Sequence, residues 1–285
     1  MNNFIVSVDF SEDSVKGLEM AVLFSQKKYV NIQMVYVQKS SQDYRPGSFE
    51  EEKHFAEKQF ENLHKKYKPH LGNDSSLRYI IKKGKIYEEI VEQAESYKES
   101  FISASTHGAS GFEEFFIGSN AFKIISATSL PVLTIRKSVP ADIKKIIVPL
   151  KLHVDTRQKV PFAADIAELF GAEIHLITIS NTRNKKDIDR LGAYLSQSAD
   201  YLRKRHLKFT MKKLYGESLV SLVNNYIEAV DGDMVTIMTS QAGNFGVLLG
   251  SYAHQMLYRS KVPVLSITPK EKHVPAGFAT QGRYK

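Results

Sequence analysis

Short apolar runs alternate with longer amphipathic stretches from one end of the chain to the other. The apolar runs are rich in Val, Ile and Leu, which predicts strands because branched side chains pack well on a pleated sheet. The predicted strands lie at about residues 3–9, 30–37, 77–83, 100–105 and 131–136, and again at about 144–149, 172–179, 207–213, 233–238 and 263–267. The predicted helices of the first half lie at 11–28, 49–67, 85–97 and 119–127, with Ser11 as the cap of the first. Strands that alternate with helices indicate an α/β fold around parallel strands.

The second half of the chain repeats the first. Three matches carry the repeat: residues 5–9 (IVSVD) with 147–151 (IVPLK), 118–121 (GSNA) with 250–253 (GSYA), and 130–135 (LPVLTI) with 262–267 (VPVLSI). Self-similarity over this length predicts two copies of one domain. The polar, proline-containing stretch 137–142 reads as a linker, so we place the domains at 1–139, the first half, and 140–285, the second half.

Each copy has five strands, which right-handed crossovers most economically join into a doubly wound parallel sheet of order 3-2-1-4-5. In this order the crossovers change direction between strands 1 and 4, and ligands bind outside the carboxyl ends of those strands. Asp9 closes strand 1 and Ser105 closes strand 4. A helix begins at Gly118-Ser119, and a helix start suits a phosphate because its N–H groups are unpaired.

Here the sequence resembles a known family. Residues 105–111 (STHGASG), followed by Gly118-Ser119 and by residues 130–135, resemble the universal stress proteins. ATP-binding members of that family show Gly, two residues, a second Gly, nine residues, and then Gly-Ser or Gly-Thr. Gly108 and Gly118 fit this spacing, whereas Ser105 replaces the first Gly.

The resemblance implies a nucleotide site in the first half. It makes Asp9 the carboxylate that reads adenine and Val37 a backbone contact to the base, although Ser7 stands where the family usually has proline. The full set that it implies for the nucleotide is Asp9, Val37, Ser105, Thr106, Gly108, Gly118, Ser119 and Asn120. The resemblance also implies that the last strands of two domains pair across a dimer, which a tandem chain can satisfy internally as a pseudo-dimer.

The second half departs from this pattern. Lys151 stands where the adenine-reading carboxylate would be, and Ile237 and Ser240 stand where the first two glycines would be, although Gly250-Ser251 is kept. We therefore expect no ordinary nucleotide in the second half. It is either structural or regulatory, or it holds another anionic ligand through Lys151.

Composition excludes several other classes. The chain has no cysteine, which excludes disulfides and thiolate chemistry, and no leader or apolar run long enough for a membrane span, so a cytoplasmic location is the default expectation. Residues 1–139 carry 18 basic and 18 acidic residues, so the whole net charge of +8 lies in the second half. Its small basic clusters at 185–186, 203–205 and 212–213 are typical of solvated faces; an anionic partner is the alternative, and no motif favours nucleic acid.

Each sharp interpretation has a plainer alternative. Asp9 could instead cap the following helix, and His107 reads as loop packing or a hydrogen bond because no Ser–Asp pairing accompanies it. No histidine spacing predicts a metal site made by side chains, and no P-loop or dinucleotide motif occurs. Glu113-Glu114 would repel a triphosphate unless they face solvent or hold a divalent cation.

Three functional hypotheses follow. The first is a stress-response protein that binds ATP or AMP in the first half without catalysis. The second is a nucleotide-free interaction or scaffold protein, which would use either the Phe-rich loop at 112–117 or the basic second half, and a protein partner or homodimer stays open. The third, an ATP-hydrolysing enzyme, has the least support because no base or fixed cation can be named.

Overall fold

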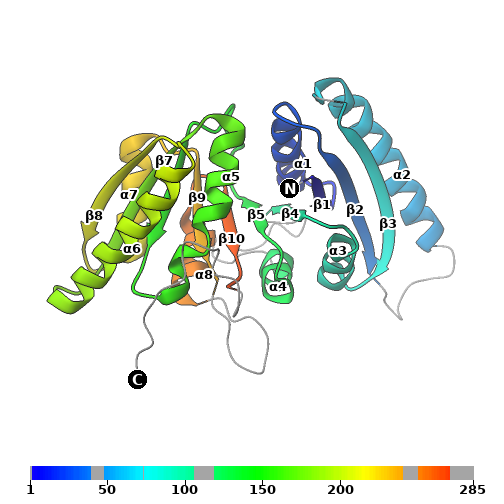
Figure 1. Ribbon diagram of the computed structural model, residues 1–285. Helices are drawn as coiled ribbons and strands as arrows, with labels where there is room; N and C mark the ends of the chain where they lie inside the picture. Colours follow the sequence, from blue (N-terminus) through cyan, green and yellow to red (C-terminus); the bar gives the residue numbers. More distant parts are fainter. Residues whose placement is uncertain (1, 40–47, 73, 106–118, 240–249, 270–285) are drawn as a thin grey trace.

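The computed structural model describes residues 2–39, 48–72, 74–105, 119–239 and 250–269 (Figure 1). The first half contains β1 (Asn3–Ser7), α1 (Glu12–Ser25), β2 (Asn31–Lys39), α2 (Ser48–Tyr67), a 3-10 turn (Lys68–His70), β3 (Ser76–Gly84), α3 (Ile86–Glu95), β4 (Ser100–Ser105), α4 (Ser119–Ala127) and β5 (Val132–Ile135). The second half contains β6 (Lys145–Leu150), a 3-10 turn (Val154–Arg157), α5 (Val160–Phe170), β7 (Glu173–Ser180), α6 (Lys185–Lys204), β8 (Phe209–Tyr215), α7 (Leu219–Val230), β9 (Met234–Met238), α8 (Ser251–Arg259) and β10 (Val264–Ile267).

The strands form one continuous sheet in the order β3-β2-β1-β4-β5-β10-β9-β6-β7-β8. Each half has the predicted order 3-2-1-4-5, and all pairs within a half are parallel. The halves meet where β5 pairs with β10 antiparallel, with Leu133 opposite Leu265. The predicted doubly wound sheets and the intramolecular pseudo-dimer are therefore confirmed.

Helices cover both faces of this sheet and give three layers. One core contains buried side chains of α1, α2, α5 and α6, and the other contains those of α3, α4, α7 and α8. Each core draws residues from both halves. The rings of Phe24 on α1 and Phe170 on α5 lie 4.9 Å apart, and Lys27 is 3.3 Å from Asp142. The two repeats thus share their cores as well as their sheet.

Local signals explain where several elements begin and end. The Oγ atom of Ser11 accepts a hydrogen bond from the N–H of Ser14 at 3.2 Å, which confirms Ser11 as the N-cap of α1. α5 ends at Gly171, whose φ of +68° is a conformation that glycine adopts without strain. β1 stops two residues before the predicted strand end because Phe10 has a φ of +64° and turns the chain. No helix within the described ranges is long and apolar enough to cross a bilayer.

Candidate functional site

The crossovers of the first half change direction between β1 and β4, which lie side by side in the sheet (Figure 1). Asp9 follows the end of β1, and Ser105 is the last residue of β4. Both are half-buried. The fold therefore brings these two predicted site residues to the same carboxyl edge, where open α/β sheets bind ligands.

The Asp9 carboxylate is fixed by the start of α1. Its Oδ1 atom accepts hydrogen bonds from Ser11 Oγ at 2.6 Å and from the Ser11 N–H at 3.1 Å, while the Asp9 N–H donates to Ser14 Oγ at 3.2 Å. Asp9 thus holds the N-cap residue in place rather than capping the helix itself. The contact orients the carboxylate as well as the helix.

Val37 lies on β2 beyond the end of β1. The N–H of Val8 donates to the carbonyl of Val35 at 3.0 Å, so the backbone groups of Val35 face β1. Residues two apart on a strand direct these groups to the same side, so those of Val37 also face the β1 side of the sheet. Because β1 ends at Ser7, which is level with Val35, Val37 lies two residues beyond that end, towards the carboxyl edge that carries Asp9.

Phe10 is a feature of the site that the sequence did not indicate. A bulky residue at φ +64° is strained, and it persists here because its ring packs 4.9 Å from Tyr36 and 5.0 Å from Phe60. This packing anchors the backbone directly after Asp9. No local motif distinguishes such a phenylalanine from any other apolar residue.

The phosphate side of the predicted site is described only in part. α4 begins at Ser119, as predicted, and Asn120 is exposed on its first turn. The predicted residues Thr106, Gly108 and Gly118 lie outside the described residues. The same holds for His107, the Glu113-Glu114 pair and the Phe-rich loop.

The second half places Lys151 where the first half has Asp9. Its N–H donates to Thr156 Oγ1 at 2.9 Å, just as the N–H of Asp9 donates to Ser14 Oγ. The Nζ atom of Lys151 lies 4.2 Å from the centre of the Tyr252 ring, on the first turn of α8. Burial lowers the pKa of Lys151. The backbone arrangement at this edge is retained while the charge is reversed.

Lys159 lies behind Lys151 and was not singled out from the sequence. It is 2% exposed, and its Nζ atom donates to Thr156 O at 2.7 Å and to Thr156 Oγ1 at 3.2 Å. Burial holds its pKa well below the ordinary value, and the charge of Lys151 adds to the effect. Arg157, 3% exposed, stacks on Tyr194 with its guanidinium carbon 4.5 Å from the ring centre. Within nine residues of sequence, Lys151 is therefore half-buried and Arg157 and Lys159 are buried.

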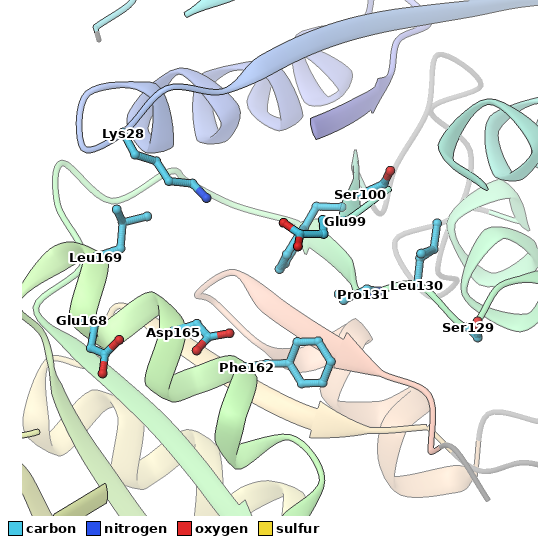
Figure 2. A pocket seen from close by; sticks show the side chains of 11 residues that line it. Lys28, Glu99, Ser100, Ser129, Leu130, Pro131, Phe162, Asp165, Glu168 and Leu169 are labelled. Carbon is cyan, nitrogen blue, oxygen red and sulfur yellow. The ribbon is translucent and has the colours of Figure 1, made fainter. Parts of the chain in front are cut away.

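A separate hollow of about 760 Å³ lies between the two halves (Figure 2). Its walls are the starts of β4 and β5 together with α5, so it lies at the edge of the first-half sheet opposite Asp9. Its lining includes the charged side chains of Lys28, Glu99, Asp165 and Glu168. Arg205 on the end of α6 forms ion pairs with Asp165 at 2.8 Å and Glu168 at 2.5 Å, so these two carboxylates hold α6 against α5. The sequence did not predict this hollow because both repeats contribute to it.

Two doubly wound α/β repeats that share one sheet define a tandem protein of the α/β class. A family model described as the universal stress protein family matches residues 1–136 and 142–267. The chain belongs to the universal stress protein family, in its tandem form.

Two solved structures share this fold over nearly the whole chain. A universal stress protein from Archaeoglobus fulgidus DSM 4304 is 18% identical, with a TM-score of 0.74 over 95% of this chain and 98% of that one. A protein of unknown function from Pseudomonas aeruginosa PAO1 is 15% identical, with a TM-score of 0.62 over 94% of this chain and 93% of that one. A shorter universal stress protein from Archaeoglobus fulgidus, solved in complex with dAMP, is 20% identical and covers 45% of this chain and 98% of its own, with a TM-score of 0.36.

No curated protein sequence matches this chain. Across the described part of the chain, no three His, Asp or Glu side chains gather in a way that could hold a metal ion.

Proposed function

We propose that the first half binds ATP or AMP at the carboxyl edge of β1 and β4, without chemical conversion, as part of a stress response. The observation that carries this proposal is the Asp9 carboxylate, which Ser11 holds at the point where the strand order reverses. Membership of the universal stress protein family and the Gly108–Gly118 spacing support it.

Each predicted residue has a task in this proposal. Asp9 accepts a hydrogen bond from the adenine amino group, and the backbone of Val37 borders the base. Ser105, Thr106 and Gly108 approach the ribose and first phosphate. Gly118, Ser119 and Asn120 supply the start of α4, where N–H groups and the helix dipole favour an anion.

We propose binding rather than catalysis because neither a general base nor a fixed cation can be named for a reaction from the sequence. A divalent cation, if one accompanies ATP, would be held by the phosphates and by water. The second half is structural or regulatory, and the cytoplasm is the expected location.

The alternative is an interaction protein that works without nucleotide. One observation favours it: the outer strand β8 exposes Met211 by 53% and Tyr215 by 49%, beside Lys212 and Lys213. An outer strand has one unpaired side and can accept a partner. The lysines also discourage indiscriminate pairing, so a partner would have to complement positive charge.

The nucleotide test uses the purified full chain. Heat denaturation should release material with adenine absorbance, and ATP or AMP should raise the melting temperature of nucleotide-free protein. We expect Asp9→Asn to weaken ATP binding about tenfold, equivalent to about 1.4 kcal/mol, in calorimetric titration. The amide oxygen can still accept from Ser11, so the helix start survives.

Asp13→Asn is the matched control. It removes one negative charge four residues away, from a side chain that pairs with Lys16, and should leave ATP affinity within about twofold. Gly118→Val should weaken binding through the phosphate side. Protein with no co-purified nucleotide and no ATP-induced thermal shift would exclude the nucleotide proposal and favour the interaction protein.

A further inference from the structure

The hollow between the two halves has the size and position of a small-molecule site. Its volume of about 760 Å³ lies within the range of about 300–1,000 Å³ that is usual for ligand pockets, which favour the junctions between domains. The starts of β4 and β5 form one side of the hollow, and α5 forms the other. Each repeat supplies only one side, so the hollow is a property of the joined chain.

Apolar side chains form much of the lining. Leu130 and Pro131 come from the first half, and Phe162 and Leu169 on α5 come from the second. Phe162 and Leu169 pack against one core and Leu130 against the other, yet all three are only partly buried. A ligand with an apolar body would cover their remaining surface, and the Phe162 ring offers a partner for a second aromatic ring.

Lys28 brings a positive charge to the first-half side of the hollow. Its Nζ atom donates to Asn2 Oδ1 at 3.0 Å, and it forms no ion pair with a carboxylate of the described residues. Burial lowers the pKa of Lys28, although the negative charges of Glu99 and Asp165 act in the opposite direction. The ammonium group is therefore only partly compensated, and a carboxylate on a ligand would stabilise it further.

Asp165 brings a negative charge to the opposite side (Figure 2). Its Oδ1 atom accepts from Arg205 Nη1 at 2.8 Å, whereas its Oδ2 atom accepts no hydrogen bond from the part of the chain that the structure describes. Glu168, one turn later on α5, already uses both of its oxygens to accept from Arg205. Oδ2 of Asp165 is thus the carboxylate oxygen of α5 that can accept from an ammonium group in the hollow.

We propose that this hollow binds a free α-amino acid with an aromatic side chain. The carboxylate of the ligand lies beside Lys28, its ammonium group beside Asp165 Oδ2, and its ring against Phe162 and Leu130. The proposal goes beyond nucleotide binding, because the hollow lies at the opposite edge of the first-half sheet from Asp9 and takes a different class of ligand.

The mixture of charges in the lining favours a zwitterion over a simple ion. Lys28 is accompanied by three acidic side chains, those of Glu99, Asp165 and Glu168. An apolar carboxylate or a phosphate would pair with Lys28 but would be repelled by the three carboxylates. An apolar amine would pair with Asp165 but would leave Lys28 uncompensated. An amino acid satisfies both sides, because its two charged groups are attached to the same carbon atom.

The test is calorimetric titration of L-phenylalanine into the purified full chain, together with two analogues that share its apolar body. Phenethylamine lacks the carboxylate, and hydrocinnamate lacks the ammonium group. We expect saturable binding of L-phenylalanine and binding of each analogue that is weaker by about tenfold or more. Absence of saturable L-phenylalanine binding, or an analogue that binds as tightly as the amino acid, would overturn the proposal.

Lys28→Met tests the charge that the ligand carboxylate needs. It should weaken L-phenylalanine binding by about tenfold or more and remove the preference for L-phenylalanine over phenethylamine. Lys27→Met is the matched control: it removes the same charge from the neighbouring lysine, which pairs with Asp142 outside the lining, and should change the affinity less than about twofold. Full affinity in folded Lys28→Met protein contradicts the proposal.

A second variant decides if circular dichroism shows that Lys28→Met does not fold. Ser129 lines the hollow and is exposed, so Ser129→Trp fills part of the space without displacing a core side chain. A loss of about fivefold or more in L-phenylalanine affinity supports the proposal, and wild-type affinity overturns it. Asp9→Asn should not alter L-phenylalanine affinity, so failure here and failure of the nucleotide proposal are distinguishable.

Discussion

Lys159 carries an ammonium group into the interior, and its protonation is linked to folding. Its folded-state pKa is well below 10.5 because burial penalises the charged form and Lys151 repels it. Between the folded and unfolded pKa values, the unfolded chain therefore binds more protons than the folded one. The contribution of Lys159 to the free energy of unfolding rises with pH across that window, and it is most unfavourable at lower pH.

Replacing this lysine should change the pH dependence of stability. We expect the free energy of unfolding of Lys159→Met, relative to wild type, to be most positive near neutral pH and to decline as pH approaches 10.5. The lost hydrogen bonds to Thr156, at about 1 kcal/mol each, shift the difference equally at every pH. Urea denaturation at pH 6 to about 10 measures it.

Lys261→Met serves as the control because Lys261 is an exposed lysine, and its difference from wild type should stay nearly constant over the same range. A difference for Lys159→Met that does not vary with pH would mean that this lysine stays charged in the folded protein.

At the scale of elements, the hydrophobic pattern predicted what depends on local periodicity. α4 begins and ends where its apolar spacing and the preceding Gly-Ser place it, at Ser119 and Ala127. Strand order followed because right-handed crossovers leave few alternatives. The strand was predicted to reach Asp9 because Val8 and Asp9 continue the alternation of apolar and polar residues. β1 ends at Ser7 instead, close to the turn at Phe10, whose ring packs against Tyr36 and Phe60.

The candidate site was predictable where it rests on sequence order and not where it rests on packing. Asp9 and Ser105 close strands 1 and 4, so topology alone brings them together. The burial of Lys159 was not predictable, because a lysine at the start of a helix usually extends into water. Thr156 matches Ser14 in the repeat, yet the shared hydroxyl contact appears only in three dimensions.

Packing of α1 against α5 joins elements of different halves and gives a second prediction. The Phe24 and Phe170 rings meet edge to face at 4.9 Å, and such aromatic pairs contribute about 0.5–1.5 kcal/mol beyond their burial. A double-mutant cycle of Phe24→Ala and Phe170→Ala should give a coupling energy in that range, measured by urea denaturation.

The control cycle pairs Phe24→Ala with Tyr215→Ala, an exposed residue on the outer strand β8, and should be additive. Additivity in the Phe24–Phe170 cycle would show that the two helices do not pack across the halves in solution.

At the scale of the whole molecule, the antiparallel pairing of β5 and β10 determines where the carboxyl edges of the two halves lie. All strands of one half run in one direction and those of the other half run in the opposite direction. The carboxyl edges of the halves are therefore opposite edges of one sheet (Figure 1). A nucleotide bound near Asp9, as proposed for the first half, would therefore not contact the end of β6, and Lys151→Met should leave ATP affinity unchanged in calorimetric titration.

The same geometry predicts that the linker is dispensable once the chain has folded. Lys137 and Ser138 are exposed, whereas the contacts between the halves lie in the sheet and in both cores. We expect a protease site inserted after Ser138 to be cut efficiently and the two fragments to co-elute in size-exclusion chromatography at the mass of the intact chain, 32.2 kDa. Adding Phe24→Ala and Phe170→Ala should make the cut protein dissociate at a lower urea concentration than the cut parent, because these changes weaken only the interface and its surroundings. Fragments that separate at once without denaturant would mean that the linker, rather than the shared sheet and cores, holds the two repeats together.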